Sequence, residues 1–99
     1  MVKIIWAERA IDDLTSIAEY SSRYSDTYAS SIVSKLFNKV DILKNMPRVG
    51  RIVPEKNDEN IREMIEGNYR IIYEIKGDDK IEVLLVHHSS RPLGNIEME

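Results

Sequence analysis

Residues 61–88 read IREMIEGNYRIIYEIKGDDKIEVLLVHH, and this stretch decides the fold. It contains three runs rich in β-branched and aromatic residues, each divided from the next by a short Gly-containing turn. The runs and turns, in order, are 61–66, Gly67-Asn68, 69–76, Gly77-Asp78-Asp79 and 80–88. Gly-Asn between two such runs is typical of a β-hairpin. The stretch therefore predicts three strands joined by tight turns.

Two helices are predicted ahead of these strands. Within residues 10–24 the apolar positions recur at the spacing of one helix face, and a second apolar stripe covers residues 28–43 and ends before Pro47. Ser25 or Asp26 can cap the second helix, because either side-chain oxygen can accept a hydrogen bond from a first-turn backbone N–H. So short a connection predicts an antiparallel helical hairpin.

The first residues add a short strand, because Val2, Ile4 and Trp6 alternate with Lys3 and Ile5. The order strand, helix, helix and then hairpin-connected strands predicts an α+β fold. In it, the N-terminal strand and the antiparallel helical hairpin pack on one face of a small antiparallel sheet, and the other face stays partly open. A chain of 99 residues has room for one domain, 1–99.

The composition limits the function. With 42% hydrophobic and 31% charged residues the chain is an ordinary globular protein, and without cysteine it has neither disulfides nor thiolate metal sites. The formal net charge of −3 gives no global field for nucleic acid, so phosphate contacts would need a local arginine cluster. The N-terminus is neither a signal peptide nor a membrane span, which predicts a cytoplasmic protein with no membrane partner. No nucleotide-binding or hydrolase motif is present, and we expect no cofactor.

Most side chains that could carry chemistry lie late in the chain. They are Arg51, Arg62, Tyr69, Arg70, Tyr73, His87, His88 and Arg91. Guanidinium groups suit phosphate, because their planar forks donate two parallel hydrogen bonds and stay charged. Several arginines on one open sheet face would form an anion site. The alternative is that they alternate with glutamates on a solvated strand and have no function.

The turn between the first two runs of the stretch sets their register. A tight two-residue turn places Arg62 opposite Tyr73, and Arg70 opposite Ile65 with Glu63 on the diagonal. The two arginines then point to opposite faces, and Arg70 can pair with Glu63. A bulge or a longer loop would be needed to bring both arginines together.

His87 and His88 are neighbours on one strand, so their side chains face opposite ways and only one can lie on the open face. We expect no metal site, because no third ligand is placed by spacing. A histidine on that face would be either a general acid or base or a structural residue. Trp6 and Phe37 are interpreted as core residues, and the tyrosines as half-buried residues.

Five segments carry a family resemblance. They are WAxRAxxDL from Trp6, LKNMPRVGRIVPE at 43–55, IRE at 61–63, YRIIYEI at 69–75 and VHHSSRPL at 86–93. In this order and spacing they resemble the RelE/ParE superfamily of toxins over nearly the whole chain. The resemblance implies a helical hairpin on an antiparallel sheet and neutralisation by a cognate antitoxin. It also implies that the complex contacts operator DNA only through that antitoxin.

The superfamily has two activities, and the resemblance is closer to the ParE-like branch. ParE-like toxins bind and poison DNA gyrase, whereas RelE-like toxins cut mRNA on the ribosome. The stretch GRxVPE from Gly50, the IRE segment and the pair His88 and Arg91 favour ParE. Growth inhibition through a protein target such as DNA gyrase is therefore the favoured interpretation. The alternatives are a ribosome-dependent mRNA endonuclease and a toxin fold that only binds a partner.

For the endonuclease, the resemblance assigns roles to Arg70, Arg91, Arg62 and His88. Arg70 matches the strand arginine near the scissile phosphate, Arg91 matches a late-strand arginine, and Arg62 would stabilise charge beside them. His88 would be the acid or base. Three features depart from that pattern, namely an Ile-Arg-Glu segment in place of a lysine pair, the absence of a C-terminal tyrosine and the net negative charge. In either case Arg51, Tyr69 and Tyr73 are candidates for binding.

Overall fold

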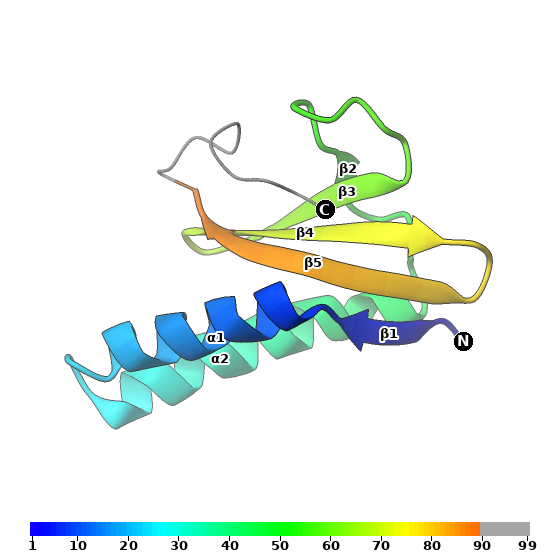
Figure 1. Ribbon diagram of the computed structural model, residues 1–99. Helices are drawn as coiled ribbons and strands as arrows, with labels where there is room; N and C mark the ends of the chain where they lie inside the picture. Colours follow the sequence, from blue (N-terminus) through cyan, green and yellow to red (C-terminus); the bar gives the residue numbers. More distant parts are fainter. Residues whose placement is uncertain (90–99) are drawn as a thin grey trace.

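A computed structural model describes residues 1–89 of the chain. Its elements are β1 (Lys3–Trp6), α1 (Glu8–Ser21), α2 (Asp26–Asp41), the 3-10 helix η1 (Ile42–Lys44), β2 (Arg51–Ile52), β3 (Ile61–Glu66), β4 (Tyr69–Lys76) and β5 (Lys80–His88). The strands form one sheet in the order β1-β5-β4-β3-β2, and the two helices lie side by side on one face of it (Figure 1). The predicted α+β architecture is confirmed.

One pairing was not predicted. β1 lies parallel to β5, with Lys3 opposite Lys80 and Trp6 opposite Val83, whereas the other neighbours in the sheet are antiparallel. The sheet is therefore mixed. A parallel pair needs a long crossover connection, and here the helical hairpin and the following strands supply it. A four-residue alternation predicts a strand but cannot identify a partner nearly 80 residues away.

Two hydrogen bonds fix the helical hairpin, one at the start of α2 and one between α1 and the sheet. Ser25 is the N-cap of α2, because its hydroxyl accepts a hydrogen bond from the backbone N–H of Tyr28 at 2.9 Å. Asp13 on α1 accepts a hydrogen bond from the backbone N–H of Val86 on β5, also at 2.9 Å, and so ties the helix to the sheet. Within residues 1–89, no helix is long and apolar enough to cross a membrane.

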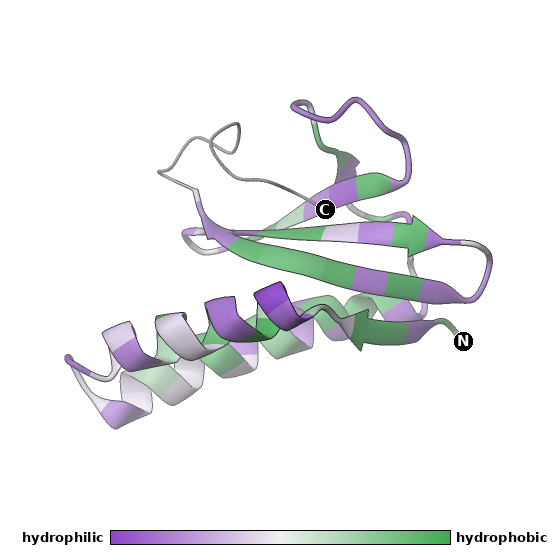
Figure 2. Ribbon diagram, viewed as in Figure 1, coloured by the Kyte–Doolittle hydropathy of each residue, from purple (hydrophilic) through white to green (hydrophobic). Residues whose placement is uncertain are grey.

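The main core lies between the helices and the sheet. Its buried members come from alternate positions of the strands and from one face of each helix: Ala10, Leu14, Leu36, Val40, Leu43, Met64, Ile71, Tyr73, Ile75, Ile81, Val83 and Val86. Figure 2 shows that β4 and β5 are hydrophobic along much of their length. Burial of side chains of this size stabilises the fold by about 1.5–3 kcal/mol each.

A second, smaller core covers part of the other face of the sheet. Val53, in the segment that follows β2, packs there with Ile72, Leu84 and Leu85. A β-bulge between β4 and β5 skips Leu84, because Ile72 is opposite Leu85 while the next residue, Tyr73, is opposite Val83. The segment after β2 thus crosses this face and leaves only part of it open.

The prediction that Phe37 is a core residue is wrong. Its side chain is 47% exposed, and its ring packs at a tilt against half-buried Trp6, with 5.0 Å between the ring centroids. The apolar stripe of α2 contains neighbouring residues, and only one of each such pair can face the sheet. Leu36 takes the inward position and Phe37 is left at its edge.

Candidate functional site

The β3–β4 hairpin has the predicted register. Arg62 is opposite Tyr73 and Ile65 is opposite Arg70, across a turn in which Gly67 has a φ of +59°. Such a left-handed backbone angle favours glycine. Arg62 and Arg70 therefore lie on opposite faces of the sheet, as the two-residue turn predicts.

Arg62 lies on the helix-covered face and binds backbone. Its Nε donates to the carbonyl oxygen of Glu59 at 2.9 Å, and its terminal nitrogen Nη1 donates to those of Gly50 at 2.9 Å and Arg48 at 3.2 Å. One guanidinium therefore holds together the chain just before β2 and the chain just before β3. This arrangement is structural rather than catalytic in its chemistry.

Tyr73 also makes its hydrogen bonds within the protein. It is fully buried, and its hydroxyl donates to the carbonyl oxygen of Pro47 at 2.9 Å and accepts from the N–H of Gly50 at 3.0 Å. Burial raises the pKa of Tyr73, which keeps the phenol neutral. A Cβ atom on Gly50 would lie 2.6 Å from this hydroxyl and from the carbonyl oxygen of Glu63, so the chain can pass here only as glycine.

Four charged side chains meet on the second face, and we call them the arginine–glutamate cluster: Arg51, Glu55, Glu63 and Arg70. The carboxylate of Glu63 is fully buried and accepts hydrogen bonds from Nε of Arg51 and, at 2.6 Å, from Nε of Arg70. The two terminal nitrogens of Arg70 donate to the two carboxylate oxygens of Glu55, each at 3.1 Å. Arg70 is only 12% exposed as a result.

The cluster is electrically balanced, because two guanidinium groups face two carboxylates. The Glu55 carboxylate, followed by that of Glu63, raises the pKa of Arg70, and Arg70 in turn lowers the pKa of Glu55. These opposite shifts are the signature of an ion pair. A balanced cluster has little long-range attraction for a phosphate.

The two histidines divide between the faces of the sheet. His87 is opposite Arg70 and is buried on the same face as the cluster, whereas His88 is exposed and opposite Tyr69. The rings of Tyr69 and His88 meet edge to face, with 5.5 Å between centroids. The sheet therefore separates His88 from Arg70.

The four residues assigned to an endonuclease are not brought together. Arg70 lies on one face, and Arg62 and His88 lie on the other. Even there, the strand partners of Arg62 and His88, Tyr73 and Tyr69, are four residues apart on β4, roughly 13 Å. Arg91 lies outside the described residues. Within residues 1–89, no three histidine or acidic side chains are grouped so that they could hold a metal ion.

The sequence matches, over residues 4–93, the family described as "ParE toxin of type II toxin-antitoxin system, parDE". The chain belongs to the ParE toxin family. A curated relative of this ParE-family toxin is Toxin RelE2 of Caulobacter vibrioides, with 25% identity over 91 residues, which cover 92% of this chain and 99% of the relative. The RelE/ParE superfamily resemblance is thereby confirmed.

Two solved structures share the fold of the ParE-family toxin. One is from the chromosomal ParDE toxin–antitoxin system of P. aeruginosa, with a TM-score of 0.75, 20% identity, and coverage of 89% of this chain and 96% of that one. The other is from the toxin–antitoxin complex RelBE2 of Mycobacterium tuberculosis, with a TM-score of 0.57, 19% identity, and coverage of 88% and 96%. At these identities the likeness concerns the fold alone.

The ParE-family toxin also exposes three tyrosines that were not singled out from the sequence. Tyr20, Tyr24 and Tyr28, around the α1–α2 connection, are each more than half exposed, and Tyr24 reaches 71%. The prediction of half-buried tyrosines is wrong for these three. The apolar stripes at 10–24 and 28–43 include Tyr24 and Tyr28, but the helix break at 22–25 and the length of the hairpin place these residues beyond the sheet (Figure 1).

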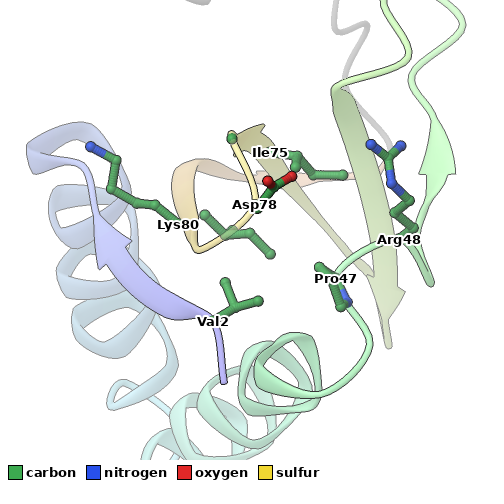
Figure 3. Close-up of a pocket in the computed structure, with 8 residues that line it drawn as sticks. Val2, Pro47, Arg48, Ile75, Asp78 and Lys80 are labelled. Carbon is green, nitrogen blue, oxygen red and sulfur yellow. The ribbon is translucent and has the colours of Figure 1, made fainter.

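A small pocket lies at the opposite end of the toxin, beside the β4–β5 turn. It has a volume of about 120 Å³ and is lined by Val2, Pro47, Arg48, Ile75, Gly77, Asp78, Lys80 and Ile81. Figure 3 shows the amine of Lys80 and the guanidinium of Arg48 pointing away from it. Such a volume suits one small side chain and excludes a nucleotide or a helix.

Proposed function

We propose that this chain is the toxin component of a type II toxin–antitoxin module. In this proposal it acts in the cytoplasm, where it inhibits growth by binding and poisoning a protein target such as DNA gyrase. The observation that carries the proposal is the state of Arg70. Its guanidinium is held by Glu63 and Glu55, and the sheet separates it from Arg62 and His88. An enzyme that stabilises charge on a phosphate needs preorganised donors with room for the substrate, and here carboxylates occupy those donors.

The alternative is a ribosome-dependent mRNA endonuclease. The 25% identity to a protein named RelE2 favours it, as does one pair in the structure. Arg70 and His87 lie opposite each other on one face, where a guanidinium and an imidazole could serve charge stabilisation and proton transfer. In that case His87, and not His88, would be the histidine of the site, and Glu55 would have to leave Arg70.

We also propose a cognate antitoxin as the second partner, with operator DNA contacted only through it. The support is indirect. The solved structures that share this fold come from a ParDE toxin–antitoxin system and a RelBE2 toxin–antitoxin complex. Copurification of the chain with the product of an adjacent gene would test this directly.

The deciding experiment measures both activities of one purified preparation. We expect the wild-type chain to inhibit DNA supercoiling by gyrase and to produce no codon-positioned cuts in mRNA on programmed ribosomes, read by primer extension. Binding to gyrase should change little with added salt, whereas binding to ribosomes would weaken steeply. Cuts in mRNA without any effect on supercoiling would overturn the proposal.

Two variants make the result specific. If the protein is an mRNA endonuclease, Arg70→Ala should abolish mRNA cleavage. If the protein acts on gyrase, a folded Arg70→Ala variant should inhibit gyrase almost as well as wild-type. Lys56→Ala is the matched control, because it removes one positive charge from the exposed loop beside the cluster without touching any of its ion pairs.

A further inference from the structure

One end of the molecule carries a group of aromatic side chains from both layers of the fold. We call it the aromatic end and define it as Tyr20, Tyr24, Tyr28, Tyr69 and His88. The α1–α2 connection, the β3–β4 turn and the last residues of β5 all lie toward this end of the molecule, at the left in Figure 1. The group is thus assembled from segments up to 68 residues apart in the sequence.

Ring contacts link the three hairpin tyrosines to one another, and a separate contact links Tyr69 to His88. The centroids of Tyr20 and Tyr24 are 6.1 Å apart and those of Tyr24 and Tyr28 are 6.0 Å apart, both edge to face. Tyr69 continues the group toward the sheet, where it meets His88. Edge-to-face pairs at these distances hold the rings in defined positions. Such contacts reduce the conformational freedom that the rings would lose when a partner binds.

The exposed tyrosines of the helical hairpin do not contribute to the core. The main core closes without the three hairpin tyrosines, of which Tyr24 is the most exposed. Tyrosine is enriched at protein interfaces because it offers a large rigid apolar surface, costs little conformational entropy and has a hydroxyl for hydrogen bonding. Several exposed tyrosines in one rigid group are the composition expected of an interface hot spot.

The charge on the aromatic end defines what would bind there. The guanidinium of Arg23 lies 5.3 Å from the centroid of the Tyr20 ring, and within residues 1–89 no carboxylate forms a salt bridge with it. Hydrogen bonding to Tyr20 raises the pKa of Tyr24, and burial, followed by the nearby Tyr28, raises that of Tyr69. These phenols stay protonated at neutral pH and can donate. A guanidinium that has no ion-pair partner within residues 1–89 and lies beside hydroxyl donors fits a carboxylate.

Nucleic acid fits this surface poorly. A single-strand platform combines stacking rings with a basic groove that follows the phosphates. Here Arg23 is the one arginine or lysine of the hairpin end, and Glu19 and Asp26 lie within four residues of it. A single cation cannot follow a run of phosphates, whereas it can pair with one carboxylate. A protein partner is therefore favoured over RNA or DNA.

We infer that the aromatic end is the surface with which the toxin binds its protein target. The segment of the target that it contacts would carry acidic side chains beside apolar ones. This inference rests on the proposed function and adds the part of the molecule that carries it. The rings would bury against the apolar residues of the target, and Arg23 would pair with a carboxylate as water leaves the interface.

The test uses the full chain in two variants, Tyr24→Ala combined with Tyr28→Ala, and Arg23→Glu alone. Each should raise the concentration needed for half-maximal inhibition of gyrase supercoiling by about tenfold or more. The matched control is Ile52→Ala combined with Val49→Ala, which removes two exposed apolar side chains near β2 and should leave inhibition unchanged. Circular dichroism and thermal unfolding check that every variant is folded, and binding to the antitoxin is measured separately.

The outcomes separate the two proposals. If wild-type chain inhibits gyrase and both variants inhibit it equally well, the inference is overturned and the proposed function stands. If the variants lose antitoxin binding while they keep gyrase inhibition, the surface belongs to the antitoxin and the inference is again overturned. If the wild-type chain itself leaves supercoiling unaffected, the proposed function fails first, and the inference fails with it.

Discussion

Arg62 and Arg70 lie on neighbouring strands of one hairpin, yet their guanidinium groups are on opposite faces of the sheet and bind opposite kinds of partner. Arg62 donates to three backbone carbonyl oxygens, and Arg70 donates to two carboxylates. The first arginine thus organises the chain around β2, and the second neutralises buried charge. Both are committed to contacts within the molecule.

Replacement of Arg62 should reveal its structural role. Arg62→Ala leaves the carbonyl oxygens of Glu59, Arg48 and Gly50 without their donor, and we expect the free energy of unfolding to fall by about 2 kcal/mol. Urea denaturation followed by circular dichroism measures this. Arg23→Ala is the control, because an exposed arginine without a salt bridge among residues 1–89 should change stability by no more than about 0.5 kcal/mol. Equal urea midpoints for the two variants would contradict the assignment.

The Tyr73 hydroxyl should matter for the same segment. In Tyr73→Phe, the N–H of Gly50 and the carbonyl oxygen of Pro47 lose their partner in a buried place, which costs about 1–3 kcal/mol of stability. Tyr24→Phe removes the same atom from an exposed ring and should have little effect on unfolding. Thermal melts of both variants at one pH test the difference. If Tyr73→Phe and wild-type have the same melting temperature, the hydroxyl does not hold the segment around Gly50 in place.

The arginine–glutamate cluster depends on Glu63. Glu63→Gln removes the buried charge that faces both Arg51 and Arg70, and leaves Arg70 partly buried with one carboxylate fewer. Breaking a buried ion pair on one side costs about 3 kcal/mol. Glu66→Gln, three residues further along β3 and without an ion pair among the described residues, is the control in chemical denaturation. A Glu63→Gln chain as stable as this control would mean that the cluster contributes nothing to folding.

Local rules were enough to predict the elements that depend on neighbouring residues. Turn length and strand alternation predicted the β3–β4 register and hence the opposite faces of Arg62 and Arg70. The pair Ser25 and Asp26 predicted a cap for α2, and Ser25 forms it. These features are set within a few residues of the chain. The period-2 pattern also showed that His87 and His88 must separate.

Relationships between distant segments could not be predicted in this way. Which histidine shares a face with Arg70 depends on the β4–β5 register and its bulge at Leu84, and this bulge is not encoded near residues 87–88. The ion pair between Glu55 and Arg70 could not be predicted either, because it depends on how the loop that contains buried Val53 folds over the sheet. The exposed tyrosines were misread because a helical repeat gives a direction but not the point at which the sheet ends.

The ion pair between Glu55 and Arg70 should make stability depend on pH. Arg70 lowers the folded-state pKa of Glu55 below its ordinary value of 4.5, so the folded state holds this proton less tightly than the unfolded state does. The pair therefore stabilises the fold fully above the ordinary value, and its contribution disappears as the pH falls through the lower folded-state pKa. Urea midpoints of wild-type and Glu55→Gln should differ near neutral pH and converge once the pH has fallen below the lowered folded-state pKa. Glu59→Gln, in the same loop without an ion pair among residues 1–89, should follow wild-type throughout. A difference for Glu55→Gln that persisted in acid would show that the contact stabilises the loop through packing and not through charge.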